Sequence, residues 1–522
     1  MQVMQPRISG TRDYIGADAI ALRAAREAIE AALRSYAYAS IDPPILERPS
    51  PFLDRSGEDI RRRMYIFSDP GGREVCLRPE LTIPACRAYL RQLQAPEDEA
   101  HMSPEREARL CYVGPAFRYE STNEGRYRQF YQAGAELIGA KWREAADAEI
   151  LAVALDALEA AGLKDILIEI GDLGILYAFV DHLPIGERSK TRLLRLALRN
   201  RKEERFISAI SAKQAADSDE TTEFGELALL LASADPGKAE LLMREVLALA
   251  DVRHVGGRAP AEIVERLASR AAQQSAEPIS AELMQGVLEL LSIRADPATA
   301  FDAVREHFRK FGVGSVDPVL EQCENRMRLF GAYRKNGAAI EFNVGLRRGL
   351  EYYTGFVFEI FAQGLTQIGH LCGGGRYDNL LEALGANLSI PAVGFAIGLD
   401  RLLIALQKSQ ADGSGVSRAP PRALVVAAGA VRHEESIRIS VALRNAGWSV
   451  ETETSGRRAR SVLSYALKRQ IPYVVFVGED ELKNGQVRIK RLDDRNDQLV
   501  ALSSLDAYVK DEGVREAAGR KT

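Results

Sequence analysis

The chain has 522 residues, of which 46% are hydrophobic and 27% are charged, and its formal net charge is −4. It is too long for one ordinary hydrophobic core, so about two to four domains of a soluble globular protein are expected. No apolar run approaches the roughly eighteen residues of a membrane helix, and the N-terminus lacks the apolar core of a secretory signal, so neither a membrane span nor secretion is expected.

The first part of the chain predicts a helix followed by strands. Apolar spacing favours an amphipathic helix over 17–38, and an extended segment follows from Ile41 to Leu46. Its prolines, Pro43 and Pro44, suit an edge or interface strand better than a central one. MYIFSD and REVCLRPE then predict a hairpin, and RLCYVGPAFRYE and RQFYQAGAELIG predict two further strands. An alanine-rich helix is expected over 143–162.

The middle of the chain, from 172 to 335, predicts mainly helices, including one over 260–274. Because it holds no catalytic constellation, we interpret it as a helical insertion. Strands return over 338–405, and the Gly-, Ser- and Pro-rich stretch 408–420 is typical of a linker. Beyond it, strands and helices follow the order βαβαββα over about 421–512. That order predicts a small, mostly parallel sheet with helices packed on it.

Three arginines are candidates for phosphate binding: Arg118 in AFRYE, Arg348 in LRRGLEYYTG and Arg401 in GFAIGLDR. Arginine offers a rigid fork of donors that matches phosphate oxygens, so three that converge would suit a triphosphate and its transfer chemistry. Taken singly, each also fits a surface ion pair. The chain lacks the P-loop and kinase motifs, and GGGRYD lacks dinucleotide-fingerprint spacing. Any nucleotide is therefore bound by another architecture.

Polar and aromatic residues accompany these arginines in the sequence. In YQAGAE, Gln132, Gly134 and Glu136 alternate, so they share one face of a predicted strand. Such groups beside aromatic rings favour a pocket for a small cationic or imidazole-bearing ligand, and a structural hydrogen-bond network is the alternative. The other members of this set are Glu80 and Thr82 of LRPELT, and Tyr352 and Tyr353 of EYYTG.

The five cysteines and six histidines show neither a CxxC pair nor metal-ligand spacing. We therefore expect reduced thiols, as in the cytoplasm, and no metal site built by the protein alone. Because the net charge is negative, any contact with RNA must come from local basic patches. The candidates are Arg457, Arg458 and Arg460 at the start of a predicted helix, and the basic residues of 487–491.

The order of several motifs resembles that of the histidyl-tRNA synthetase family. They are GTRDY, PPILERPSPF, LRPELT, GPAFRYE with GRYRQFYQAGAELIG, RRGLEYYTGFVFE, GGGRYD and VGFAIGLDRL. VVFVGEDELKNGQVRIKRLDD resembles the family's anticodon-binding domain, so the resemblance covers nearly the whole chain. It implies an α+β catalytic domain with a class II synthetase-type antiparallel sheet flanked by helices and a helical insertion. A C-terminal α/β anticodon-binding-type domain would follow.

The resemblance also implies where these domains begin and end. Residues 1–170 would form the first part of the catalytic domain, with motifs 1 and 2, and 171–335 the mainly helical insertion. Residues 336–407 would complete the catalytic domain with the histidine motif and motif 3. The linker 408–420 would lead to the anticodon-binding-type domain at 421–512.

The implied activity is that of a cytoplasmic histidine--tRNA ligase, a homodimer that activates L-histidine with ATP and transfers it to tRNA(His). Arg118 would hold the α-phosphate and Arg401 the γ-phosphate, while Arg348 would stabilise charge on the α-phosphate during attack. Mg²⁺ would neutralise the pyrophosphate. The implied ATP contacts are Arg118, Glu120, Arg348 and Arg401. The implied histidine contacts are Glu80, Leu81, Thr82, Arg126, Gln132, Glu136, Tyr352 and Tyr353.

A second resemblance is to a paralogous group, the regulatory subunits of ATP phosphoribosyltransferase. PFLDRSGEDIRRRMY, RPELTIPACR and GGRAPAEIVERL look closer to that group, and the loop STNEGRYRQF lacks the Pro-Gln pair of synthetases. This alternative implies a histidine sensor that partners the catalytic subunit of ATP phosphoribosyltransferase. Such subunits usually lack both the C-terminal domain and the arginine found here as Arg348, so the ligase is favoured. A pure RNA-binding protein would leave the three arginines unexplained.

Overall fold

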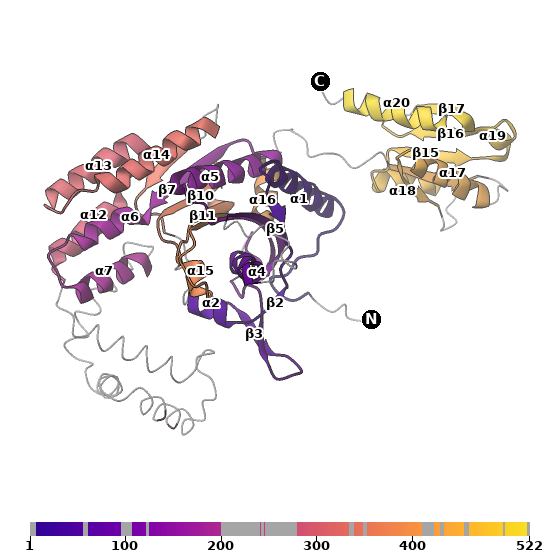
Figure 1. Ribbon diagram of the computed structural model, residues 1–522. Coiled ribbons are helices and arrows are strands. Elements are labelled where there is room, and N and C mark those ends of the chain that lie inside the picture. Colours follow the sequence, from indigo (N-terminus) through magenta and orange to yellow (C-terminus); the bar gives the residue numbers. More distant parts are fainter. Residues whose placement is uncertain are drawn as a thin grey trace. The chain divides into compact units, whose positions relative to one another are not determined.

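The structure is a computed structural model, and the chain forms two compact units, Met1–Ser414 and Gly415–Thr522. Each unit is described by itself, with its elements labelled as in Figure 1. The structure describes residues 7–55, 61–94, 107–121, 125–199, 241, 245, 279–333, 339–347, 352–409, 422–428, 433–453, 459–493 and 496–518. Within these ranges, no helix combines the length and the apolar character that crossing a membrane requires.

The first unit is built on a nine-stranded sheet in the order β1-β5-β6-β12-β11-β10-β7-β9-β8. Neighbouring strands are antiparallel except at the β1–β5 and β7–β9 pairs. The long central strands are rich in apolar residues because helices or loops cover both of their faces. The strands are β1 (Ala39–Ser40), β5 (Ala108–Phe117), β6 (Gln129–Ile138), β7 (Ile166–Asp172), β8 (Arg294–Ala295), β9 (Ala339–Asn343), β10 (Phe356–Ala362), β11 (Cys372–Arg376) and β12 (Ala392–Gly398).

Helices α1 (Ala17–Ser35), α5 (Arg143–Ala160) and α16 (Leu399–Ser409) pack against this sheet. Helix α1 buries Leu22, Ala25, Ile29 and Leu33, a helical spacing that gives it one apolar face. It ends three residues before the predicted boundary, because the chain turns at Ala37 with a φ of 61°. Helix α5 is buried along most of its length, and its many alanines let it lie close to the sheet and to its neighbours.

The first unit also holds a small three-stranded sheet in the order β2-β4-β3. The predicted hairpin is present as β3 (Tyr65–Ser68) and β4 (Glu74–Leu77). The expected strand from Ile41 to Leu46 is wrong in its bounds: β2 is only Leu46–Glu47, and β1 ends before the prolines. The first unit also holds α2 (Ser50–Arg55), α4 (Thr82–Gln94) and α15 (Leu380–Ala383), of which α15 packs on α4, and a 3₁₀ turn (Thr366–Ile368) that packs on α16.

The middle of the chain is mainly helical where it is described, with the short strand β8 between two of the helices, as Figure 1 shows for the helices. Asp172 caps α6 by accepting the Gly174 N–H at 2.8 Å, and Asp296 caps α13 ahead of Pro297. The helix expected over 260–274 lies outside the described residues. The helices are α6 (Leu173–Asp181), α7 (Glu187–Arg199), α12 (Ala281–Ser292), α13 (Pro297–Lys310) and α14 (Asp317–Tyr333).

The second unit holds a five-stranded sheet in the order β14-β13-β15-β16-β17. The first three strands are parallel, whereas β16 and β17 add antiparallel to one side. The sequence predicts the parallel part but not β17, whose DQLVA pattern is short and weakly alternating. The elements are β13 (Arg422–Ala427), α17 (His433–Asn445), β14 (Ser449–Thr452), α18 (Ala459–Lys468), β15 (Tyr473–Val477), α19 (Glu479–Lys483), β16 (Gln486–Arg491), β17 (Asp497–Ala501), a 3₁₀ turn (Leu502–Ser504) and α20 (Leu505–Ala518).

Candidate active site

Glycines on neighbouring strands make room for polar side chains above the large sheet. Glu136 on β6 lies opposite Gly394 on β12, and a Cβ at Gly394 would stand 1.6 Å from the Glu136 Oε2. Gly134 pairs with Tyr112, and a Cβ there would stand 2.6 Å from the tyrosine hydroxyl oxygen. Both distances are far below van der Waals contact, so these two positions admit only glycine while the side chains keep their places.

Glu136 lies at the centre of this space and is fully buried. The Tyr112 hydroxyl donates to its Oε1 at 2.8 Å, and the Tyr377 hydroxyl donates to its Oε2. Burial raises the pKa of Glu136 to about 8, against the opposing effect of these hydroxyl donors. Within the described part of the chain, no lysine or arginine forms an ion pair with this carboxylate. A cationic or N–H-bearing ligand would supply the missing partner.

The segment between β4 and α4 closes one side of the space. Glu80, 1% exposed, accepts the backbone N–H groups of Thr82 at 2.6 Å and Ile83 at 2.8 Å. Its carboxylate therefore stabilises the N-terminus of α4, where orphan N–H groups and the helix dipole favour negative charge. The Leu81 N–H donates to Gln132 Oε1 at 3.1 Å. Burial raises the pKa of Glu80, and the two N–H donors oppose that rise.

Three tyrosines form the aromatic side of the site. The ring centroids of Tyr352 and Tyr353 lie 4.9 Å apart, and Tyr377 meets them edge-on at 5.6 and 6.4 Å. All three rings are buried. Sequence reasoning selected Tyr352 and Tyr353 but missed Tyr377 and Tyr112, the two residues whose hydroxyls hold Glu136. Tyr377 belongs to GGGRYD, a motif that was noted for its glycines and rejected as a dinucleotide fingerprint.

Arginines gather next to this pocket. Arg118, the residue after β5, donates from Nε to the Pro79 carbonyl at 2.7 Å. Arg401, near the start of α16, donates to the carbonyls of His370 at 2.9 Å and Gly125 at 3.3 Å. Burial lowers the pKa of Arg401, and the charges of Arg126 and Arg118 lower it further. The three cations therefore repel one another, which is the electrostatic signature of an anion site.

Two carboxylates balance these cations in part. Glu120 pairs with Arg63 at 3.2 Å, and Glu359 on β10 lies 3.4 Å from the His370 Nδ1. The charges of both carboxylates also act on Arg401 and oppose the lowering of its pKa. Among the residues that the structure describes, no cluster of three or more His, Cys, Asp or Glu could hold a metal by itself. Two carboxylates that act on the same group of cations do fit Mg²⁺, which usually binds one or two carboxylates together with substrate phosphates.

The structure brings most of the predicted site residues together. Glu80, Leu81, Thr82, Gln132 and Glu136 are all buried, and hydrogen bonds join Leu81 to Gln132, Thr82 to Tyr112 and Tyr112 to Glu136. The charge of Arg118 acts on both Glu80 and Arg401, so the two arginines lie near this group, and Arg126 is exposed. Arg348, the residue given the central catalytic role in the sequence analysis, lies outside the described residues. So do Arg457 and Arg458, as does the side chain of Arg460.

The titration of Glu136 gives a prediction for stability. Its pKa in the folded protein, about 8, lies above its ordinary value of 4.5, so between these values the folded state keeps a proton that the unfolded state has released. The free energy of unfolding should therefore fall as pH rises through this window, by at most about 1.4 kcal/mol per pH unit. Glu136→Gln removes this fall in the free energy of unfolding, because glutamine does not ionise. The substitution should therefore raise the melting temperature more at pH 8 than at pH 5. Thermal unfolding at both values checks this, and an equal shift at both would contradict it.

Comparisons with known proteins agree with this geometry. A family model described as histidyl-tRNA synthetase matches residues 10–254 and 241–402, and one described as an anticodon binding domain matches 423–512. A curated histidine--tRNA ligase from Methanocaldococcus jannaschii is 30% identical over 512 residues, which cover 97% of this chain and 100% of that protein. The histidine--tRNA ligase from Pyrococcus furiosus is 29% identical over 517 residues, covering 97% of this chain and 99% of that protein.

Solved structures show the same fold. The crystal structure of histidyl-tRNA synthetase from Nostoc sp. PCC 7120 superposes with a TM-score of 0.67 at 19% identity, covering 98% of this chain and 100% of that one. A Bacillus halodurans structure, titled ATP phosphoribosyltransferase regulatory subunit/histidyl-tRNA synthetase, gives 0.59 at 20% identity, covering 92% of this chain and 99% of that one. At such identities these matches establish the architecture alone, and the expected class II-type fold with its C-terminal domain is confirmed.

Proposed function

The chain belongs to the histidyl-tRNA synthetase family, and on that premise we propose that it is a histidine--tRNA ligase that forms histidyl-adenylate and transfers the histidyl group to tRNA(His). The observation that carries the proposal is the buried carboxylate of Glu136, held by two tyrosine hydroxyls, together with the neighbouring Glu80 on which Arg118, one of a group of mutually repelling arginines, acts. Such a site matches a small cationic amino acid on one side and a polyphosphate on the other.

In this proposal Glu136 recognises the substrate's imidazole N–H, and the tyrosine hydroxyls fix the orientation of its carboxylate. Burial strengthens that bond, because a charge-assisted hydrogen bond gains strength where water is excluded. Glu80, Leu81, Thr82 and Gln132 form the adjoining wall, where Glu80 keeps the start of α4 in place. The rings of Tyr352 and Tyr353 supply the apolar surface against which an imidazole packs.

The arginines would bind ATP. Arg118 is assigned to the α-phosphate and Arg401 to the γ-phosphate, while Arg126 remains assigned to histidine. The mutual repulsion of these arginines is relieved when phosphate binds, which offsets part of the cost of bringing them together. Glu120 and Glu359 are the carboxylates that would hold Mg²⁺, which shields charge on the phosphates. The resemblance to the family implies that Arg348 would stabilise the charge that develops on the α-phosphate.

The reaction requires two groups to meet in line. The histidine carboxylate attacks the α-phosphate and pyrophosphate leaves, so holding both substrates in one geometry provides much of the rate enhancement. Arg118 is well placed for this step. Its Nε is fixed on the Pro79 carbonyl at 2.7 Å, one residue before Glu80, so the phosphate ligand and the wall of the histidine pocket share one rigid segment.

The second unit would bind the tRNA. Its strand-borne cations are already paired: Arg488 donates to Glu481 at 2.7 and 3.0 Å, and Lys490 lies 3.5 Å from Asp497. Local neutralisation of this kind leaves little positive charge for phosphate contacts. We therefore assign RNA contact to the arginines at positions 457, 458 and 460 in preference to this strand.

We also propose a cytoplasmic homodimer. Large apolar side chains are exposed around the short sheet of the first unit: Leu46 on β2 is 55% exposed and Phe67 on β3 is 44% exposed. Ile45 is 42% exposed. Ile45 and Leu46 directly follow Pro44, which the resemblance places at the dimer interface. Exposed large apolar side chains on one small sheet are typical of a subunit contact.

Histidine-dependent exchange of pyrophosphate into ATP tests the function. The purified protein should catalyse exchange with L-histidine and not with the other amino acids. Histidine binding without exchange would overturn the proposal and favour the alternative, a regulatory subunit. In that case the protein should co-purify with an ATP phosphoribosyltransferase catalytic subunit and should not charge tRNA(His).

A further inference from the structure

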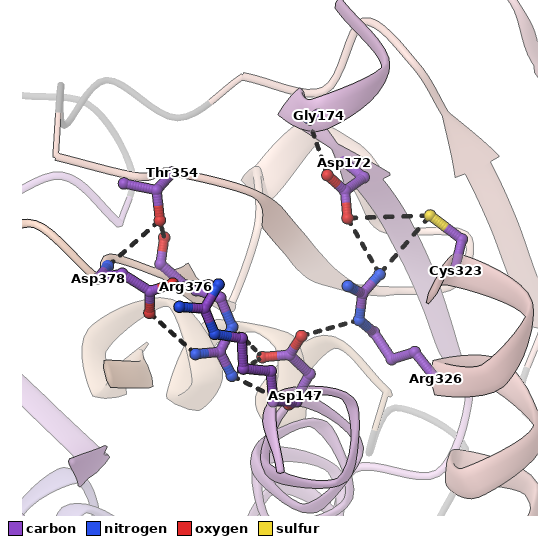
Figure 2. Close-up of polar contacts among 9 residues, drawn as sticks. Asp147, Asp172, Gly174, Cys323, Arg326, Thr354, Arg376 and Asp378 are labelled. Atoms are coloured by element: carbon purple, nitrogen blue, oxygen red, sulfur yellow. Dashed lines mark hydrogen bonds and ion pairs between the residues drawn. The ribbon is translucent and has the colours of Figure 1, made fainter. Parts of the chain in front are cut away.

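A buried ion network joins the helical insertion to the strand that carries GGGRYD. Figure 2 shows two arginines that meet on Asp147 of α5 from different elements. Arg326 of α14 donates from Nε to its Oδ2 at 2.9 Å, and Arg376 of β11 donates to its Oδ1 at 2.9 and 2.6 Å. Each of the three residues is at most 5% exposed. Arg326 also pairs with Asp172 at 3.1 Å.

The network continues from Arg376 toward the pocket. Arg376 Nη1 donates to Asp378 Oδ1 at 2.9 Å. The Thr354 N–H donates to the Arg376 carbonyl at 2.8 Å, and the Asp378 N–H donates to Thr354 Oγ1 at 3.2 Å. Thr354 directly follows Tyr353, and Arg376 directly precedes Tyr377. The ions therefore fix the backbone beside two of the aromatic residues of the site.

Arg376 and the pocket lie on different sides of strand β11. A Cβ at Gly375 would stand 2.9 Å from the ring of Tyr353, so that face of the strand looks toward the tyrosines. Successive residues of a strand point to opposite faces, so Arg376 points away from them, toward α5. The network thus lies on the face of β11 opposite the tyrosines, where it supports the pocket without contacting a ligand.

Stability alone does not account for this arrangement. Burying charges costs desolvation, and well-packed apolar side chains often stabilise a core as well as an ion network does. The network fixes the relative positions of the elements it joins, because each guanidinium sets the direction of its carboxylate partners. Contiguous hydrogen bonds carry this positioning from one element to the next.

We propose that Arg326 is a positioning residue for the amino-acid pocket: the insertion helix α14 sets, through Asp147 and Arg376, the positions of Tyr353 and Tyr377. This inference rests on the proposed function, because it assigns the network a role in histidine binding. It gives the helical insertion a part in recognising the amino acid.

Arg326→Met tests the proposal, since methionine keeps the length of the side chain and removes the fork. In the exchange assay the KM for histidine should rise about tenfold, with the KM for ATP within about twofold. Arg326→Lys keeps the charge and should recover part of the loss. The matched control is Arg328→Met, on the same helix but exposed, which should behave as wild type. Equal changes in the two KM values, or no change in either, would overturn the proposal.

Thr354→Val tests the connection itself and involves no buried charge, so it also decides the matter if Arg326→Met does not fold. It should raise the KM for histidine in the same way. The double variant should raise it by less than the product of the single effects, because both changes break one chain of contacts. A fully multiplicative effect would refute the connection. If the wild type binds histidine without exchange, the proposed function fails, and calorimetric Kd values for the same variants still decide this inference. If it does not bind histidine, both fail.

Discussion

Glu136→Gln is expected to raise the KM for histidine in the exchange reaction by about a hundredfold while the KM for ATP stays within about twofold. Glutamine keeps the size of the side chain but cannot acquire the charge that Glu136 gains when it ionises near pH 8, and a hydrogen bond to a buried charged group contributes about 1.5–3 kcal/mol. The remaining amide also presents its own N–H groups where the ligand needs an acceptor. Initial-rate kinetics over a range of histidine concentrations measure the effect.

Two controls separate recognition from folding. Glu321→Gln removes an exposed carboxylate on α14 and should leave both KM values unchanged. Glu136→Gln itself should melt no lower than the wild type at pH 8, since it removes a buried charge whose ionisation opposes folding. A variant that is stable and binds histidine as the wild type does would show that Glu136 is structural only.

Arg401→Met is expected to lower kcat/KM for ATP by about a hundredfold with little change in histidine affinity. Its guanidinium lies among other cations, so its favourable partner is an incoming phosphate. Loss of one charge-assisted phosphate contact costs about 1.5–3 kcal/mol. The variant should be about as stable as the wild type, because it loses two hydrogen bonds to carbonyls but relieves repulsion from Arg118 and Arg126.

The measurement is exchange kinetics at saturating histidine with varied ATP, with calorimetric histidine binding alongside. Arg401→Lys keeps the charge but not the forked donors of the guanidinium. Its kcat/KM for ATP should therefore lie between those of the wild type and of Arg401→Met. A kcat/KM within threefold of wild type in the methionine variant would remove Arg401 from the nucleotide site. A parallel loss of histidine affinity would point to damage of the whole fold.

The sequence predicts the architecture well because its strongest signals are local. Apolar spacing placed α1, and alternation placed β6 with Gln132 and Glu136 on a shared face. The order of motifs identified the family. These features depend on residues that are close together in the sequence, so the sequence pattern alone indicates them.

What could not be predicted depends on pairings between distant positions. Tyr112 and Tyr377 lie 24 and 241 residues from the Glu136 that they hold, and no local pattern links them. Glu80 was predicted as a ligand contact, and its carboxylate is found at the N-terminus of α4. An acidic residue can contact a ligand or stabilise a helix N-terminus. Only the position at which α4 begins shows that Glu80 stabilises a helix N-terminus. The network around Asp147 could not be predicted either, because its two arginines come from elements that are distant in the sequence.

The glycines of the sheet limit how the specificity of this site can change. Gly394 has no side chain because Glu136 occupies that volume, so the two positions hold one side chain between them. Gly394→Ala alone meets the carboxylate, and a smaller residue at 136 alone leaves a void that costs stability. A Cβ at Gly394 would also stand 2.7 Å from the Ala135 carbonyl oxygen, so the backbone of β6 keeps this position a glycine even where residue 136 is made smaller. An altered amino-acid preference is therefore reached by changing residue 136 together with the side chains that contact it while Gly394 is kept, and variation at 394 itself will cost stability.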